Sequence, residues 1–211
     1  TGLYFSKELE HLAKELSFQI DFGSLEKIPK KSSTLHVLSE AYETGGHTRV
    51  VERWIEATKF NQPNSVLFTR KSKVPKRLKA AVNASGGRLY TLADKNSSVL
   101  QALELRRVAN MHSRVVLHVH MDDILPLLAF GQGDYSGELN FYNHADHQFW
   151  VGASLPCKFL EVRSWGKALS FSRRSIENSR VLGIPMSSDL TPSTLVTQKS
   201  AKAELGIPNS S

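Results

Sequence analysis

Five of the eight histidines lie in three short segments, each of which also holds glycine, aspartate or a second histidine. An imidazole can accept and donate hydrogen bonds, ligate a metal ion or carry a proton near neutral pH. Histidines grouped in this way indicate a site for sugar hydroxyls and phosphate, or a metal centre. The five residues are His47, His118, His120, His144 and His147.

The first segment is a glycine loop, Thr44-Gly45-Gly46-His47-Thr48-Arg49. Adjacent glycines permit positive φ and close approach of a ligand, and the helix expected to follow offers unpaired N–H groups to an anion. We therefore predict that Gly45, Gly46, His47 and Arg49 bind the phosphate groups of a ligand. Neither the Gly-x-Gly-x-x-Gly dinucleotide fingerprint nor a phosphate loop ending in Gly-Lys-Ser/Thr is present. A strand-to-helix turn also uses glycine for geometry alone, and this alternative stays open.

The other two segments allow two interpretations. His118 and His120 alternate on one predicted strand, and His144, Asp146 and His147 could add nitrogen and carboxylate ligands, as in a metal-dependent hydrolase. No Asp or Glu follows at a familiar metalloenzyme spacing, and alternating strand histidines can also be core groups. We favour direct hydrogen bonding to sugar and phosphate, with no metal and no cofactor.

Composition describes an ordinary globular chain with an excess of positive charge. It has 211 residues, 40% hydrophobic and 22% charged, with a formal net charge of +7. The densest basic stretch, Arg70 to Lys79, is interpreted as a solvated face or as a contact with an anionic membrane or lipid-linked acceptor. No aromatic-studded strand or DNA-binding helix pattern accompanies it, so we expect no nucleic-acid partner. No apolar run reaches the roughly 20 residues of a membrane helix, which favours the cytoplasm, with peripheral membrane contact as a further expectation.

Strand and helix patterns alternate along most of the chain. Strands are predicted at 35–41, 65–69, 88–92, 114–120, 138–143, 158–163 and 180–184, and an amphipathic helix at 6–22 precedes them. Helices are predicted after Gly46 and at 75–84, 97–111, 122–130, 148–153 and 166–174. Such alternation predicts an α/β fold, a doubly wound, mostly parallel, Rossmann-like sheet with an N-terminal helical appendage. Ligands of this fold collect beyond the carboxyl ends of the strands, where all three histidine segments are expected.

In this order the motifs resemble the N-terminal domain of glycosyltransferases with the two-domain B-type fold (GT-B), in the retaining class that includes glycogen and sucrose synthases. The residues that carry the resemblance run from Glu43 to Arg49, from Val116 to Asp122 and from Tyr142 to Trp150. The His-Asp pair of that class is interrupted here by Ala145, so either His144 or His147 would contact the sugar.

The resemblance implies transfer of a sugar from a nucleotide-sugar donor to a hydroxyl of a carbohydrate or lipid-linked acceptor. It assigns catalytic roles to His144, His147 and Asp146, and a site-lining role to His118 and His120. It divides the chain into a helical appendage (1–33), a Rossmann-like glycosyltransferase domain (34–186) and a linker opening a second domain (187–211), without which the chain would be inactive. The metal-dependent hydrolase and a non-catalytic sugar- or phosphate-binding module remain the alternatives.

Overall fold

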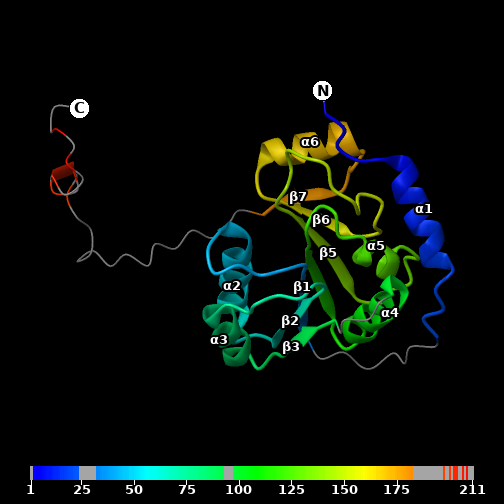
Figure 1. Cartoon of the computed structure of the whole chain (residues 1–211), viewed down its shortest axis with the longest axis horizontal. Helices are drawn as coiled ribbons and strands as arrows, with labels where there is room; N and C mark the ends of the chain where they lie inside the picture. The colour runs from blue at the N-terminus through cyan, green and yellow to red at the C-terminus, as the bar shows by residue number, and fades with distance from the viewer. Residues whose placement is uncertain are drawn as a thin grey trace.

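A computed structural model describes residues 2–23, 32–92 and 97–182, and six single residues between 197 and 208 (Figure 1). Its seven strands are β1 (Thr34–Leu38), β2 (Asn64–Phe68), β3 (Leu89–Thr91), β4 (Arg114–His118), β5 (Glu138–Asn143), β6 (Lys158–Glu161) and β7 (Ser179–Val181). Its six helices are α1 (Lys7–Phe18), α2 (Gly46–Thr58), α3 (Lys76–Ala84), α4 (Ser98–Ala109), α5 (Leu125–Phe130) and α6 (Ser164–Arg174). Within these ranges, no helix has both the length and the apolar character needed to cross a membrane.

The strands form one sheet in the order β3-β2-β1-β4-β5-β6-β7, and every pair is parallel. The chain first winds outward from β1 to β3 and then crosses back to β4 on the other side of β1. This arrangement confirms the predicted α/β, doubly wound, Rossmann-like fold. The order reverses between β1 and β4, where Leu38 pairs with His118, and this reversal is where such sheets bind ligands.

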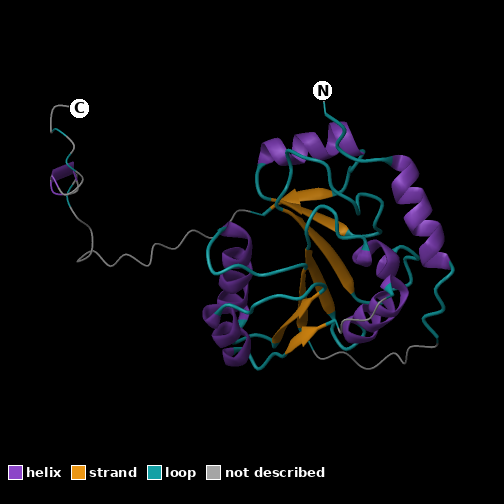
Figure 2. Ribbon diagram, viewed as in Figure 1, coloured by secondary structure: helices purple, strands orange, loops and turns teal. Residues whose placement is uncertain are grey.

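Helices cover both faces of the sheet (Figure 2). Helices α2 and α3 pack together on one face, and α4, α5 and α1 pack together on the other. Strands β1 and β2 are buried along their whole length, as expected for central parallel strands covered twice. The central strands are therefore held rigidly, and the loops at their carboxyl ends start from fixed points.

Helix α1 contributes to the same hydrophobic core as the sheet. Ala13, Ile20 and Phe22, from α1 and the turn after it, are buried in the main core cluster. The buried carboxylate of Glu10 accepts backbone hydrogen bonds from Gly152 at 2.6 Å and from Ser154 at 3.0 Å. This N-terminal segment thereby fixes the loop between β5 and β6.

The helix predicted at 148–153 is wrong, because residues 144–157 form an irregular loop. Gly152 has a φ of 112°, which an α-helix cannot contain, and the Trp150 ring stacks on Phe141 with centroids 4.7 Å apart. Tertiary packing thus uses the apolar residues that suggested a helix. Strands β1 and β4 also end earlier than predicted, which places Ser39 and His120 in the loops above the sheet. The predicted linker at 187–211 lies almost entirely outside the described residues.

Candidate functional site

The three histidine segments meet at the carboxyl edge of the sheet, above β1, β4 and β5. The ring centroid of His47 lies 6.4 Å from that of His118, 6.1 Å from that of His120 and 4.4 Å from that of His144. Residues from separate parts of the sequence are thus gathered around the imidazole of His47. Their common location was predicted, because each segment follows a predicted strand of a doubly wound sheet, but His147 is not among these ring contacts.

The glycine loop leads into α2 without a side-chain cap. Gly45 is the N-cap residue with a φ of 110°, which excludes most other residue types, and Gly46 begins the helix. Among the described residues no side chain caps this end, and the first turn of α2 contains no acidic residue. Its N–H groups and the positive end of the helix dipole are therefore suited to an anion.

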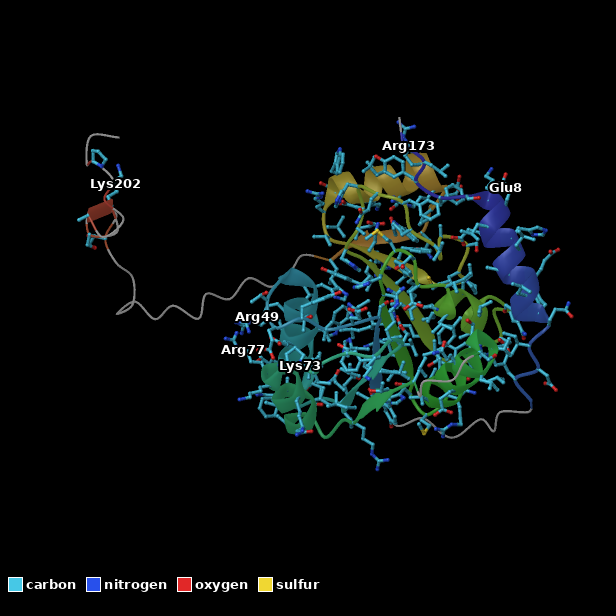
Figure 3. The ribbon with its side chains drawn as sticks, viewed as in Figure 1. Glu8, Arg49, Lys73, Arg77, Arg173 and Lys202 are labelled. Atoms are coloured by element: carbon cyan, nitrogen blue, oxygen red, sulfur yellow. The ribbon has the colours of Figure 1, made fainter. Side chains whose placement is uncertain are left out.

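Arg49 is already engaged in an ion pair. Its Nη1 lies 3.0 Å from Oε2 of Glu52, one turn further along α2, and the Glu52 side chain is only 6% exposed. The positive charge that the sequence suggested for donor phosphates is thus partly compensated. Figure 3 shows Arg49 at the outer side of α2.

The position of the proton on His47 follows from its hydrogen bond. Nε2 lies 2.7 Å from the carbonyl oxygen of His118, so Nε2 carries the proton and donates it. In the neutral ring Nδ1 is then an acceptor, and it is buried without a partner among the described residues. Burial and the nearby charge of His120, opposed by this hydrogen bond, lower the pKa of His47. His144 has its pKa lowered to about 4, chiefly by burial, and its Nδ1 also lacks a described partner.

A second histidine pair lies beneath this cluster and was missed from the sequence. Nδ1 of His36 lies 3.1 Å from Nε2 of His118, and both side chains are fully buried under Trp54 of α2. Burial lowers the pKa of His36 to about 4 and that of His118 well below its ordinary value. The register places His36 opposite Val116, two residues before His118, so both side chains lie on the same face of the sheet. This register is set only when β1 and β4 pair.

Tyr42 is another site residue that the sequence did not indicate. Its ring is parallel to that of His120, with centroids 6.0 Å apart, and its hydroxyl lies 3.4 Å from His120 Nε2. The hydroxyl also donates to Glu40 at 3.1 Å. Tyr42 is 45% exposed, so this ring forms an accessible wall beside the histidines.

Asp146 is held by ion pairs rather than exposed to a ligand. Its carboxylate accepts two hydrogen bonds from Arg163, at 2.8 and 2.9 Å, and lies 3.2 Å from Nδ1 of His147. The Arg163 hydrogen bonds, against some desolvation, lower the pKa of Asp146. The His147 ring is 60% exposed, so its other nitrogen, Nε2, is the one left for a ligand. Asp146 therefore orients His147.

Arg174 fixes the same loop from below. It donates to the carbonyl oxygens of Asp146 at 3.1 Å and Gln148 at 2.7 Å, and its guanidinium lies 4.7 Å from the Trp150 ring centroid. No spacing rule in the sequence connects these residues, because they meet only when α6 packs beside the loop. The loop that carries His144 and His147 is thus anchored by two arginines.

Asp123 ties together three loops at the edge of the sheet. Its Oδ2 accepts hydrogen bonds from Ser39 after β1 and Thr69 after β2, both at 2.5 Å, and its Oδ1 accepts the N–H of Leu125 at 3.1 Å. Ser39 Oγ in turn accepts the N–H of His120 at 2.8 Å. Asp123 thus accepts the N–H of the first residue of α5, and Asp122 instead pairs with Arg70 at 3.0 Å.

Metal ligation receives no geometric support. Across residues 2–23, 32–92 and 97–182, no three His, Cys, Asp or Glu side chains are grouped so that they could hold a metal ion. His118 is buried against His36 and Tyr142, and His120 lies against Tyr42.

Comparisons of the chain with protein-family models, with curated proteins and with solved structures gave no match.

Proposed function

We propose that this chain is a glycosyltransferase domain of the GT-B type that transfers a sugar from a nucleotide-sugar donor to an acceptor hydroxyl. The observation that carries the proposal is the contact between His47 and His144, 4.4 Å between ring centroids, at the reversal of strand order. This contact joins the glycine loop to the loop after β5 in the crevice where doubly wound sheets bind ligands. Both rings are neutral at physiological pH, which suits hydrogen bonding to hydroxyls.

The donor diphosphate is assigned to the start of α2. Gly45 and Gly46 leave open space around the backbone, and the uncapped N–H groups there can neutralise charge on a departing diphosphate. Nδ1 of His47 accepts hydrogen bonds. It therefore suits a hydroxyl group of the nucleotide sugar, which can donate, better than a phosphate oxygen, which can only accept. Arg49 can assist only by exchanging its Glu52 partner for phosphate.

The reaction consists of one exchange of bonds at the anomeric carbon. The bond from that carbon to the diphosphate oxygen breaks, a bond to the acceptor oxygen forms, and the proton of the acceptor hydroxyl passes to the oxygen of the departing diphosphate. His144 and His147 are proposed to hold the transferred sugar, and Asp146 to fix the ring of His147. Catalysis then rests on positioning and on stabilisation of the leaving diphosphate, with no cofactor.

The proposal is tested by titrating the 211-residue chain with UDP-glucose, UDP-N-acetylglucosamine and GDP-mannose in a calorimeter. At least one donor is expected to bind, and His144→Ala should weaken that binding by about tenfold or more, because it removes a desolvated hydrogen-bonding group. His11→Ala, a change in an exposed histidine of α1, serves as the matched control and should leave binding unchanged.

Product analysis then separates an enzyme from a binding module. The protein as the cell makes it is incubated with the donor that binds and with candidate acceptors, and glycosylated products are identified by mass spectrometry. Transfer that falls at least 100-fold in His144→Ala or His147→Ala supports the proposal. Absence of transfer by the protein as the cell makes it, or unchanged transfer in both variants, contradicts it.

A further inference from the structure

A separate cavity opens at the same edge of the sheet, on the side of α4 and α5. It has a volume of about 260 Å³ and lies beyond the carboxyl ends of β2, β3 and β4. This volume is just below the roughly 300–1,000 Å³ of pockets that hold drug-sized ligands, so it suits one small ring. Its polar lining comes from Thr69, Arg70, Lys71, Gln101, Asp122 and Asp123.

The floor of the cavity is a fixed carboxylate. Asp123 is 4% exposed, and its oxygens are engaged by Ser39, Thr69 and the N–H of Leu125. Through Ser39 it connects to the backbone of His120, so the cavity adjoins the histidine cluster. A ligand in the cavity would therefore lie next to the proposed transfer site.

Two of the lining side chains can bind hydroxyl groups. Asp122 has a side chain that is 67% exposed, and Gln101 offers an amide oxygen and an amide nitrogen. Desolvation opposes ionisation of Asp122, but the hydrogen bond and charge of Arg70 prevail and lower its pKa. An ionised carboxylate beside an amide is a suitable acceptor and donor set for neighbouring hydroxyls of a sugar.

The segment that reaches the cavity from β2 is rich in positive charge. Between Glu56 and Asp94 the chain contains eight Lys and Arg residues and no Asp or Glu. Of these, Arg70 and Lys71 line the cavity, Arg70 is paired with Asp122, and Lys71 is exposed. Lys73 and Arg77 lie on the same side of the molecule as Arg49, toward α2 and α3 (Figure 3). The exposed ammonium group of Lys71 therefore attracts an anion to the cavity.

We propose that this cavity is an acceptor subsite for a phosphorylated sugar, with hydroxyls bound by Asp122 and Gln101 and the phosphate by Lys71. The inference rests on the proposed function only in calling the ligand an acceptor. The phosphate can belong to a free sugar phosphate or to the headgroup of a glycerophospholipid such as phosphatidylinositol, which also presents a six-membered ring of hydroxyl groups next to a negatively charged phosphate.

Binding is measured without donor, so that its result is independent of transfer. Glucose 6-phosphate, glucose and inorganic phosphate are titrated into the whole chain by calorimetry, and sedimentation is measured with phosphatidylcholine vesicles with and without phosphatidylinositol. We expect the phosphorylated ligand, as the free sugar or in the vesicle, to bind at least tenfold more tightly than glucose. Binding in calorimetry identifies a free sugar phosphate as the ligand, and binding to vesicles only when they contain phosphatidylinositol identifies the lipid headgroup.

Two charge-removing variants decide whether the cavity is responsible. Lys71→Gln should weaken binding of the phosphorylated ligand about tenfold, whereas Lys79→Gln, an exposed change in α3 outside the cavity, should change it less than twofold. Gln101→Leu removes a side chain proposed to bind sugar hydroxyls. It should weaken the binding of glucose 6-phosphate but not that of inorganic phosphate. Circular dichroism verifies that each variant is folded. Equal losses in Lys71→Gln and Lys79→Gln, or no phosphorylated ligand bound in either arm, would overturn the subsite. Absence of transfer with this binding intact would count only against the proposed function.

Discussion

The imidazole of His47, in the first turn of α2, lies against the imidazole of His144, directly after β5, with ring centroids 4.4 Å apart and planes inclined by 38°. The two rings come from distant parts of the chain. His47 is held by its hydrogen bond to the carbonyl of His118. His144 is held by a loop that Asp146, Arg163 and Arg174 anchor.

Gly46→Ala separates a folding role of the glycine from a ligand-binding role. A Cβ at Gly46 meets no atom within 4 Å and its φ is ordinary, so thermal unfolding should show unchanged or slightly raised stability. If the backbone there approaches donor phosphates, calorimetry should show donor affinity reduced by about tenfold. Gly166 differs, because a Cβ there would lie 2.6 Å from Asp146 Oδ2, which is too close. Gly166→Ala should therefore destabilise the fold. Unaltered donor affinity in Gly46→Ala would remove Gly46 from the phosphate site.

Arg163→Gln tests whether Asp146 acts by positioning. The substitution leaves a nearly buried carboxylate without its two hydrogen bonds from Arg163, so the midpoint of urea unfolding should fall. Turnover should fall as well, since the loop that holds His144 and His147 loses an anchor. Lys167→Gln, on the exposed side of α6, is the control. A variant that keeps wild-type stability would show that the Asp146–Arg163 pair contributes nothing.

Asp123→Ala should be among the most destabilising changes at the sheet edge. It leaves the hydroxyls of Ser39 and Thr69 and the N–H of Leu125 without their acceptor in a buried setting. Denaturant unfolding should show a loss of about 2–5 kcal/mol. Thr69→Val removes one of the three hydrogen-bond donors to Asp123 at nearly constant side-chain volume. It should lower the free energy of unfolding by about 1 kcal/mol. Comparable effects of the two changes would argue against a shared role of Asp123.

His36 should make the fold less stable in mild acid. Its pKa is about 4 in the folded chain and about 6.5 when unfolded, so between these values the unfolded state binds a proton that the folded state does not. Stability should fall as pH drops from 6.5 to 4, by about 3 kcal/mol from this residue alone. His36→Phe should flatten the pH dependence measured by urea unfolding, whatever its effect at pH 7. His11→Asn, at an exposed position, should not change the slope. An identical slope in His36→Phe would contradict this assignment.

The sequence by itself determined the α/β fold and the edge of the sheet at which the three histidine segments meet. Strand and helix periodicity are local, and parallel strands joined by crossovers bring their carboxyl ends together. The same local patterns could not predict the His36–His118 pair, the stacking of Tyr42 on His120 or the pairing of Asp146 with Arg163. Each of these depends on strand register or on helix packing between residues far apart in the chain.

Tertiary structure also decided which polar groups are free. Arg49 pairs with Glu52, Asp146 pairs with Arg163, and the predicted helix at 148–153 gave way to a loop in which Trp150 packs on Phe141. A residue type indicates what a side chain can bind. Whether it remains available is set by which partner the fold brings within hydrogen-bonding distance, because a buried charge is stable only when it is paired.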